Sequence, residues 1–240
     1  MGGNLAIIPA RGGSKRIARK NIRPFAGRPI LAWSVEVARQ SRLFDRVMVS
    51  TDDAGIAEVA RAAGAEVPFL RSGENADDHA TIADVLREVI AAYAQEGEHF
   101  DRVACLFATA PMMQAGDLKR GLACMDDGSF DVVIPVARFG YPIQRSLSRG
   151  SDGALRLNFP EHANTRSQDL EPAYHDAGQW VWTTPGFLES GAPLLGPGTG
   201  SIVLDGALVE DIDTEEDWRR AEWKFEHMRE ALGHGESVDA

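Results

Sequence analysis

The chain has 240 residues, enough for one substantial hydrophobic core, and its 44% hydrophobic and 25% charged residues are typical of a globular protein. Acidic residues outnumber basic ones by 36 to 25, which argues against a nucleic-acid partner because phosphate backbones select basic surfaces. No apolar run approaches the roughly 20 residues of a membrane span, and the amino-terminal segment lacks the pattern of a secretory signal. The two cysteines, Cys105 and Cys124, lie in apolar segments and are expected to be buried, reduced thiols.

Short apolar runs alternate with amphipathic stretches through the first part of the chain. Strands are predicted at residues 5–9, 46–50, 66–70, 101–108 and 131–139. Helices are predicted at residues 29–42, 54–63, 81–95 and 115–125. Gly64 is expected to end the second helix, and Thr81 with Asp84 forms a capping-box pattern at the start of the third. This alternation indicates an α/β fold whose mainly parallel sheet is covered by helices on both faces.

The periodic pattern stops after residue 140. The Asp152–Gly153 pair stands between short extended pieces and predicts a hairpin. We therefore expect one domain over residues 1–240, with an arm inserted at about 140–177. A return strand at 178–183, a weaker strand at 201–204 and a final amphipathic helix at 214–232 complete the expected elements.

A basic, glycine-containing loop follows the first predicted strand. Residues 1–35 contain no acidic residue. They contain seven basic ones: Arg11, Lys15, Arg16, Arg19, Lys20, Arg23 and Arg28. Gly12 and Gly13 permit a tight turn whose amides and cations can surround phosphate oxygens, so the ligand suggested is a di- or triphosphate. The order of residues fits neither a Walker A loop nor a G-x-G-x-x-G motif. The alternative is a solvated loop that merely balances an acidic surface.

The stretch VEDIDTEEDW (residues 209–218) is the acidic counterpart. If it is extended, Asp211 and Asp213 point to the same side and can hold Mg²⁺, which prefers carboxylate, phosphate and water oxygens. The alternative is helix capping, since Thr214 and Asp217 resemble a capping box. The two interpretations are compatible.

The motifs IIPARGGSKRIARKN, FDRVMVSTDD, LRSGENADDH, ATAP and VEDIDTEEDW occur in an order that resembles the nonulosonic acid (CMP-sugar) cytidylyltransferases over nearly the whole chain. The stretches YPIQRSL and NTRSQDLEPAYHDAGQWVW are most similar to the subgroup that activates pseudaminic acid. Sialic-acid enzymes commonly have Gln at the position of Phe107 and Arg at that of His175, so these two residues depart from that subgroup. The alternatives are synthetases for CMP-N-acetylneuraminate, CMP-legionaminate or CMP-3-deoxy-manno-octulosonate, or a non-catalytic nucleotide-binding protein.

The resemblance implies a Rossmann-like nucleotide-diphosphosugar transferase fold with a small β-containing dimerisation arm. It also implies a cytoplasmic homodimer that uses Mg²⁺ to convert CTP and a nine-carbon keto sugar acid into a CMP-sugar and pyrophosphate.

The resemblance further implies roles for particular residues. Catalytic roles are expected for Arg11, Lys15, Lys20 and Asp213, and metal binding for Asp211 and Asp213. Nucleotide binding is expected of Ala10, Arg11, Gly12, Gly13, Ser14, Lys15, Asn21, Arg71, Asp78, Ala80 and Thr81. Sugar binding is expected of Gln144, Arg145, Arg166, Gln168, Tyr174 and His175, with Arg166 gripping the sugar carboxylate.

Several of these residues have simpler interpretations. Asn21 and Thr81 are also suited to helix starts, and Arg71 to an ordinary surface position. Arg166 is equally suited to a salt bridge between the two arms of a dimer, and His175 to a structural role.

Overall fold

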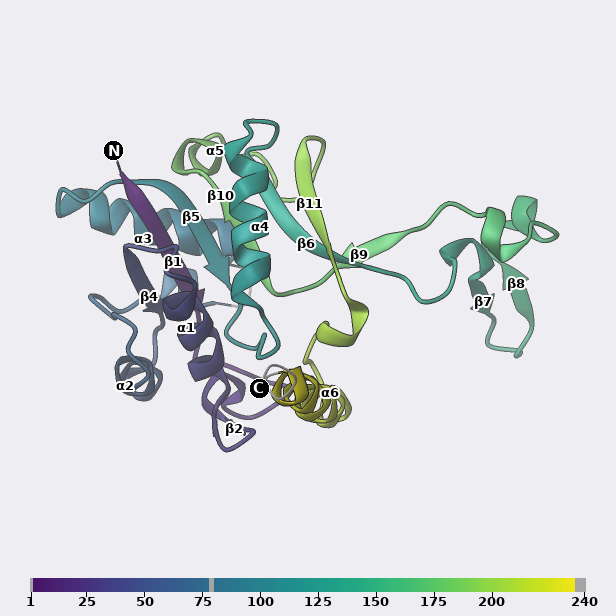
Figure 1. The fold of residues 1–240 in the computed structure, drawn as a ribbon, viewed down its shortest axis with the longest axis horizontal. Coiled ribbons are helices and arrows are strands. Elements are labelled where there is room, and N and C mark those ends of the chain that lie inside the picture. The colour runs from purple at the N-terminus through teal and green to yellow at the C-terminus, as the bar shows by residue number, and fades with distance from the viewer. Residues whose placement is uncertain (1, 78–79, 236–240) are drawn as a thin grey trace.

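The computed structural model describes residues 2–77 and 80–235, and Figure 1 shows a central sheet with helices packed around it. The strands lie in the order β11-β6-β10-β5-β1-β4, with β9 also paired to β6. Their bounds are β1 (Gly3–Pro9), β4 (Arg46–Ser50), β5 (Phe100–Leu106), β6 (Val132–Arg138), β9 (Tyr174–Asp176), β10 (Trp180–Thr183) and β11 (Thr199–Leu204). Strands β1, β4 and β5 pair in parallel, as do β6 and β11, whereas β9 and β10 pair antiparallel with their neighbours. The predicted α/β fold with a mainly parallel sheet is confirmed.

Helices cover both faces of this sheet. One face carries α1 (Ile30–Ser41), α2 (Ala54–Ala62) and α4 (Ala115–Asp126), and the other carries α3 (Ile82–Gln95) and α5 (Pro185–Glu189). Along β1, Ala6 and Ile8 pack into the first core while Leu5 and Ile7 pack into the second. Both faces of β1 are therefore buried, which explains its continuous apolar sequence.

Several helix ends lie where the sequence predicts them. Thr81 and Asp84 form the capping box of α3. Gly64, with φ +93°, follows the end of α2 in a backbone region that favours glycine.

The prediction of a strand at residues 66–70 is wrong. Only Glu66 pairs there, through a single bridge with Met48. Pro68 has no N–H to donate, so a parallel ladder beside β4 cannot continue through it. The chain instead turns away towards Arg71, whose N–H donates to the Thr51 carbonyl.

The carboxy-terminal helix α6 (Glu215–Gly235) packs against the loop that follows β1, beside the small hairpin β2 (Pro24–Phe25) and β3 (Arg28–Pro29). Phe25 contacts Trp218 and Phe225 edge-on, with ring centroids 5.5 and 5.3 Å apart. Ile17 from the basic loop and Ile212 from the acidic segment belong to the same buried cluster. This packing brings the two charged motifs together.

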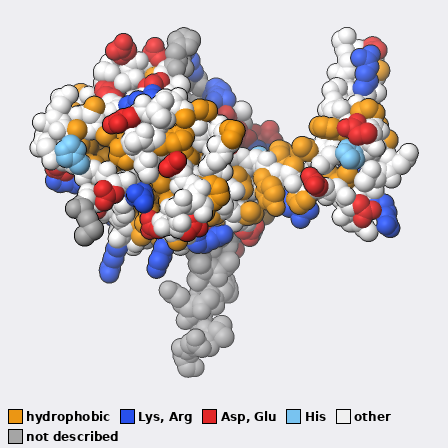
Figure 2. All heavy atoms as spheres, turned by 90° about the horizontal axis from the view of Figure 1, so that it is seen from above, with side chains coloured by type: hydrophobic (Ala, Val, Ile, Leu, Met, Phe, Trp, Pro, Cys, Tyr) orange, Lys and Arg blue, Asp and Glu red, His pale blue; other side chains and the backbone are white. Residues whose placement is uncertain are grey.

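Part of the segment between β6 and β9 leaves the body of the molecule as an arm (Figure 1), and β9 itself pairs with β6 in the central sheet. At its outer part, β7 (Leu147–Arg149) and β8 (Leu155–Leu157) form the predicted hairpin, with Gly153 at φ +85° in the turn. Hydrophobic side chains gather along the narrow part of the arm (Figure 2). The arm runs back through β9 into β10.

Neither cysteine forms a disulfide. Cys105 is buried, and this burial raises the pKa of its thiol to about 12, whereas Cys124 is half-buried. None of the helices in the described part of the chain combines the length and apolar character needed to cross a membrane.

Two glycines of α4 provide a test of the core. A Cβ on Gly121 would lie 2.9 Å from Trp182 and closer still to Trp180, and both rings are fully buried. Gly121→Ala should therefore lower the free energy of unfolding by about 1–3 kcal/mol, the usual cost of overpacking a core. Urea denaturation measures this directly.

The matched control is Gly116→Ala in the same helix, because a Cβ there meets nothing within 4 Å. It should leave stability unchanged or raise it by up to about 1 kcal/mol through better helix propensity. Equal effects of the two substitutions would contradict the packing described for Gly121.

Candidate functional site

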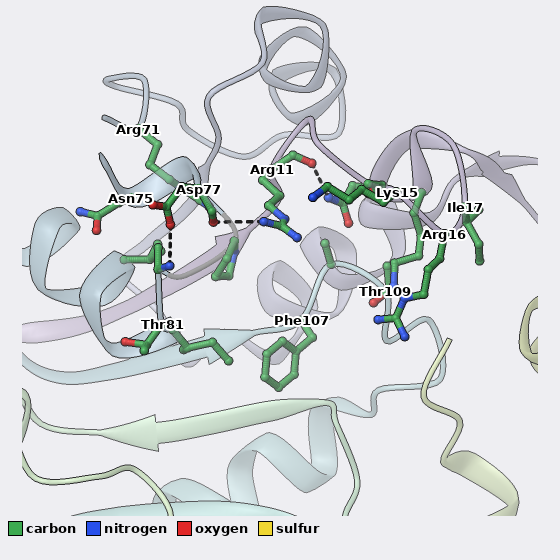
Figure 3. A pocket seen from close by; sticks show the side chains of 18 residues that line it. Arg11, Lys15, Arg16, Ile17, Arg71, Asn75, Asp77, Thr81, Phe107 and Thr109 are labelled. Atoms are coloured by element: carbon green, nitrogen blue, oxygen red, sulfur yellow. Dashed lines mark hydrogen bonds between the residues drawn. The ribbon is translucent and has the colours of Figure 1, made fainter. Parts of the chain in front are cut away.

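A cavity of about 490 Å³ opens at the carboxyl ends of β1 and β5, beside Pro9 and Phe107. Its walls come from the basic loop, from parts of residues 71–77 and 80–85, and from residues 107–109 (Figure 3). Ligands of open α/β sheets commonly bind at this edge, so the position itself marks a candidate site.

Positive charge dominates the cavity. The basic residues that line it are Arg11, Lys15, Arg16, Lys20 and Arg71, whereas Asp77 is the one acidic residue among its described lining residues. Such an excess in an acidic chain favours a multiply charged anion. Arg11 also reaches across the cavity, donating from Nη1 to the Asp77 carbonyl at 3.0 Å (Figure 3).

Asn21 and Asp52 help to shape the basic loop. The buried Asn21 side chain donates from Nδ2 to the Arg11 carbonyl at 2.9 Å. The Gly12 N–H donates to Asp52 Oδ1 at 2.9 Å, and a Cβ on Gly12 would lie 3.0 Å from Asp53. The lack of a side chain at Gly12 therefore lets the loop lie close to the turn at Asp52 and Asp53. Asn21 is not a helix cap, because the N-cap of η1 (Lys20–Ile22) is Arg19.

The acidic segment reaches the rim of the cavity through Asp213. Arg16 pairs with Asp213 at 2.7 Å, and Lys20 Nζ lies 3.4 Å from the same carboxylate. Lys20 also donates to the Ile212 carbonyl at 2.6 Å. Because Arg16 and Lys20 both line the cavity, the basic loop and the acidic segment converge on one site.

Asp211 and Asp213 lie on either side of the buried Ile212, near enough for their charges to interact. Partial burial raises the pKa of Asp211, and the negative charge of Asp213 raises it further, against the opposing effect of Lys20 and Arg16. A divalent cation would relieve this repulsion, and the oxygen donors suit Mg²⁺.

The other acidic residues of this stretch are engaged elsewhere. Asp217 caps α6 by accepting from the N–H groups of Asp213 and Thr214, and Glu215 pairs with Arg23. The described residues contain no group of three His, Cys, Asp or Glu able to hold a metal. A cation held by Asp211 and Asp213 would therefore need phosphate and water oxygens as its remaining ligands.

Arg71 is buried rather than an ordinary surface residue, with 8% exposure. Its Nε donates to Ser50 Oγ at 3.0 Å and its Nη2 donates to the Ser50 carbonyl. Burial lowers the pKa of Arg71, while the negative charges of Asp52 and Glu88 raise it. This fixed guanidinium lies on the cavity wall with Ala80 and Thr81. Asp78 lies outside the described residues.

The cavity is thus lined by eight of the residues expected at the nucleotide and catalytic sites: Arg11, Ser14, Lys15, Lys20, Asn21, Arg71, Ala80 and Thr81. Ala10, Gly12 and Gly13 belong to the same loop without lining the cavity.

The residues expected to bind the sugar lie between β6 and β10, with Tyr174 and His175 in β9 beside β6 and the other four further out along the chain of the arm. Several make contacts within the arm itself: Gln144 donates to the Glu171 carbonyl and Arg145 to the Thr165 carbonyl. Arg166 pairs with Asp169 of the same chain at 3.1 Å, and His175 packs edge-on against Phe139. Gln168 and Tyr174 are exposed. None of the six lines the cavity of its own chain.

Sequence reasoning missed several cavity residues, namely Arg16, Asn75, Asp77 and Thr109. It noted Phe107 only as a departure from related enzymes. The place of Phe107 and Thr109 in the sequence could have identified them, because they follow the end of β5, at the sheet edge where ligands of α/β folds commonly bind.

Comparisons with known proteins agree with this geometry. The family described as cytidylyltransferase matches residues 5–152. A pseudaminic acid cytidylyltransferase of Campylobacter jejuni is 40% identical over 89% of this chain and 92% of its own. A CMP-N,N'-diacetyllegionaminic acid synthase of Legionella pneumophila is 32% identical over 95% of this chain and 98% of its own. The fold is similar to a solved CMP:2-keto-3-deoxy-manno-octonic acid synthetase complexed with CTP, with a TM-score of 0.69, 18% identity and coverage of 94% and 99% of the two chains.

Arg71→Lys tests the cavity as a nucleotide site. Lysine keeps the positive charge but cannot form both hydrogen bonds that the planar Arg71 guanidinium donates to Ser50. The charged group is then no longer fixed on the cavity wall. We expect CTP to bind about tenfold more weakly, equivalent to about 1.4 kcal/mol, by isothermal titration calorimetry.

Arg61→Lys is the matched control, because Arg61 also donates to a main-chain carbonyl, that of Val67, but does not line the cavity. Unchanged CTP affinity in Arg71→Lys, or the same loss in both variants, would contradict a direct role for Arg71.

Proposed function

This chain belongs to the cytidylyltransferase family, and from that premise we propose that it joins CTP to a nonulosonic acid, with pseudaminic acid as its substrate. The products are the CMP-activated sugar and pyrophosphate. The observation that carries the proposal is the convergence of Arg16 and Lys20 with Asp213 at a cavity lined by basic residues.

The reaction is an in-line substitution at phosphorus. The anomeric hydroxyl oxygen of the sugar bonds to the α-phosphorus of CTP, the bond to the bridging oxygen breaks, and pyrophosphate leaves with that electron pair while the hydroxyl proton passes to water. Charge increases on the phosphate oxygens during this step, so positioned cations lower the barrier.

Arg11 and Lys15 hold the triphosphate, and Lys20 neutralises charge nearest the reacting phosphorus. Asn21 supports the loop through the Arg11 carbonyl, and Arg71 recognises the base beside Ala80 and Thr81.

Asp211 and Asp213 hold the Mg²⁺ in this proposal. A bound Mg²⁺ would orient the phosphates and lower the pKa of the attacking hydroxyl. Arg16 and Lys20 contact Asp213, so the proposed metal ligand lies directly beside the cations proposed to hold the phosphates.

Pyrophosphate release with CTP, Mg²⁺ and a panel of sugar acids tests the proposed activity. Pseudaminic acid should give a kcat/KM at least about tenfold above those of N-acetylneuraminic, legionaminic and 3-deoxy-manno-octulosonic acids. UTP and ATP should be poor replacements for CTP. Equal use of all three nucleotides would contradict the base site, and no release with any acid would contradict the enzymatic assignment.

We also propose that the protein acts as a homodimer in the cytoplasm, a location that its free cysteines support. None of the residues proposed to bind the sugar lines the cavity of its own chain, and we propose that they serve the cavity of a second copy. Leu147, Leu155 and Leu157 share one face of the arm hairpin and are 51%, 61% and 40% exposed. A second chain would cover this apolar face.

Sedimentation equilibrium tests the dimer. The wild-type protein should have twice the 26.0 kDa chain mass, whereas Leu155→Asp should shift it towards the monomer because a carboxylate is costly to bury in the contact. Leu195→Asp, at a residue 69% exposed on the body, is the control and should remain dimeric. A monomeric wild type at micromolar concentration would contradict the proposal.

A further inference from the structure

The segment from Leu208 to Asp213 has no sheet to hold it. Strand β11 ends at Leu204, the short helix η6 (Gly206–Leu208) follows, and α6 begins at Glu215. Backbone carbonyls that lack strand partners must find other donors. In this segment those donors are side chains from distant elements.

Three carbonyls of the segment accept from three different parts of the fold. Gln179 Nε2 donates to the Leu208 carbonyl at 2.7 Å, and Lys224 Nζ donates to the Val209 carbonyl at 2.6 Å. Lys20 Nζ donates to the Ile212 carbonyl at 2.6 Å. These contacts bracket Asp211 on both sides.

Lys224 also binds the side chain of Glu210. Its Nζ lies 2.8 Å from Glu210 Oε2, and Arg220 Nε donates to Glu210 Oε1 at 2.7 Å. The Glu210 and Lys224 side chains are only 9% and 20% exposed, so the pair is better shielded from water than an ordinary surface salt bridge. The Glu210 side chain is therefore held against α6, whereas Asp211 and Asp213 lie near the basic-loop residues Lys20 and Arg16.

Gln179 connects the same segment to the arm and to the cavity wall. It is 3% exposed and stands directly before β10, where the arm rejoins the sheet. Its main-chain carbonyl accepts from the Phe107 N–H at 2.9 Å. The orientation of the Gln179 side-chain amide is fixed, because a flipped amide would place Oε1 against the Leu208 carbonyl, and two acceptors cannot bond. In this orientation Oε1 has no hydrogen-bond partner among the described residues. A buried polar side chain with an unsatisfied oxygen is costly, which points to a role beyond packing.

We propose that Lys224 and Gln179 are positioning residues that hold the segment 208–213 so that Asp211 and Asp213 stay beside the cavity-lining residues Arg16 and Lys20. The inference rests on the proposed function, because it takes those two carboxylates as ligands of the cation that accompanies CTP. Lys224 acts from α6 and Gln179 from the start of β10, and neither touches the substrate. Groups that hold metal-binding carboxylates typically change metal affinity 10–100-fold when they are removed.

The test measures metal binding apart from turnover. Mn²⁺ is titrated into the full-length protein with saturating CTP, and free Mn²⁺ is followed by its EPR signal. Lys224→Met should weaken Mn²⁺ binding at least about tenfold, with the affinity for CTP in EDTA changed less than about twofold. Lys224→Arg, which keeps a donor for Glu210 and Val209, should recover Mn²⁺ binding to within about threefold of wild type. The Mg²⁺ concentration for half-maximal pyrophosphate release should follow the same order.

Gln179→Leu is the second variant, since it removes the contact with Leu208 at nearly constant volume, and it too should weaken Mn²⁺ binding without loss of CTP affinity. Lys119→Met, at an exposed position of α4, removes the same charge as Lys224→Met and should bind Mn²⁺ like wild type. Wild-type Mn²⁺ binding in both Lys224→Met and Gln179→Leu would overturn the proposal, as would equal losses in Lys119→Met.

Asp213→Ala separates this outcome from failure of the proposed function. If Asp213→Ala retains turnover and Mn²⁺ binding, the metal assignment itself is wrong. If Asp213→Ala loses both while Lys224→Met and Gln179→Leu keep both, only the positioning role is wrong.

Discussion

The packing of α6 against the loop after β1 decides where the chemistry can take place. Phe25, Trp218 and Phe225 form the centre of this contact, and Ile17 and Ile212 extend it into the two charged motifs. Each aromatic pair contributes on the order of 1 kcal/mol beyond the burial of its surface. Because Ile17 and Ile212 are buried in the same cluster, Arg16 and Asp213 beside them are held at the same rim of the cavity. This apolar contact thus joins two segments that lie far apart in the sequence.

Ion pairs add to this apolar contact between the two segments. The basic residues of the opening segment find acidic partners from elsewhere in the fold: Arg16 and Lys20 contact Asp213, Arg19 contacts Asp53, and Arg23 contacts Glu215. These ion pairs compensate part of the positive charge of the opening segment. The cavity still has more basic than acidic lining residues, which suits a triphosphate that arrives with its own cation.

The proposed function assigns the two substrates to two parts of the chain, CTP to the cavity and the sugar acid to the arm. The cavity of the body offers cations and a buried guanidinium, whereas the arm offers the polar residues expected to bind the sugar and an exposed row of leucines. Gln179 lies at the junction between them, bound to the cavity wall through Phe107 and to the acidic segment through Leu208. Gln179 therefore connects the start of β10 to the segment that carries the carboxylates proposed to hold the metal.

The sequence by itself determined the features that depend on neighbouring residues. Apolar strands, the Thr81–Asp84 capping box, the Asp152–Gly153 hairpin turn and the paired Asp211 and Asp213 all follow from local pattern, because side-chain direction and turn geometry are local properties. The predicted strand at 66–70 failed for a reason also present in the sequence, since Pro68 lacks the N–H that a ladder needs. Only the tertiary structure decided that Arg16 pairs with Asp213, that Glu210 turns away to Lys224 and Arg220, and that none of the six residues expected to bind the sugar lines the cavity of its own chain. These contacts join residues distant in the chain, and their partners depend on how α6 and the arm pack, which no local pattern encodes.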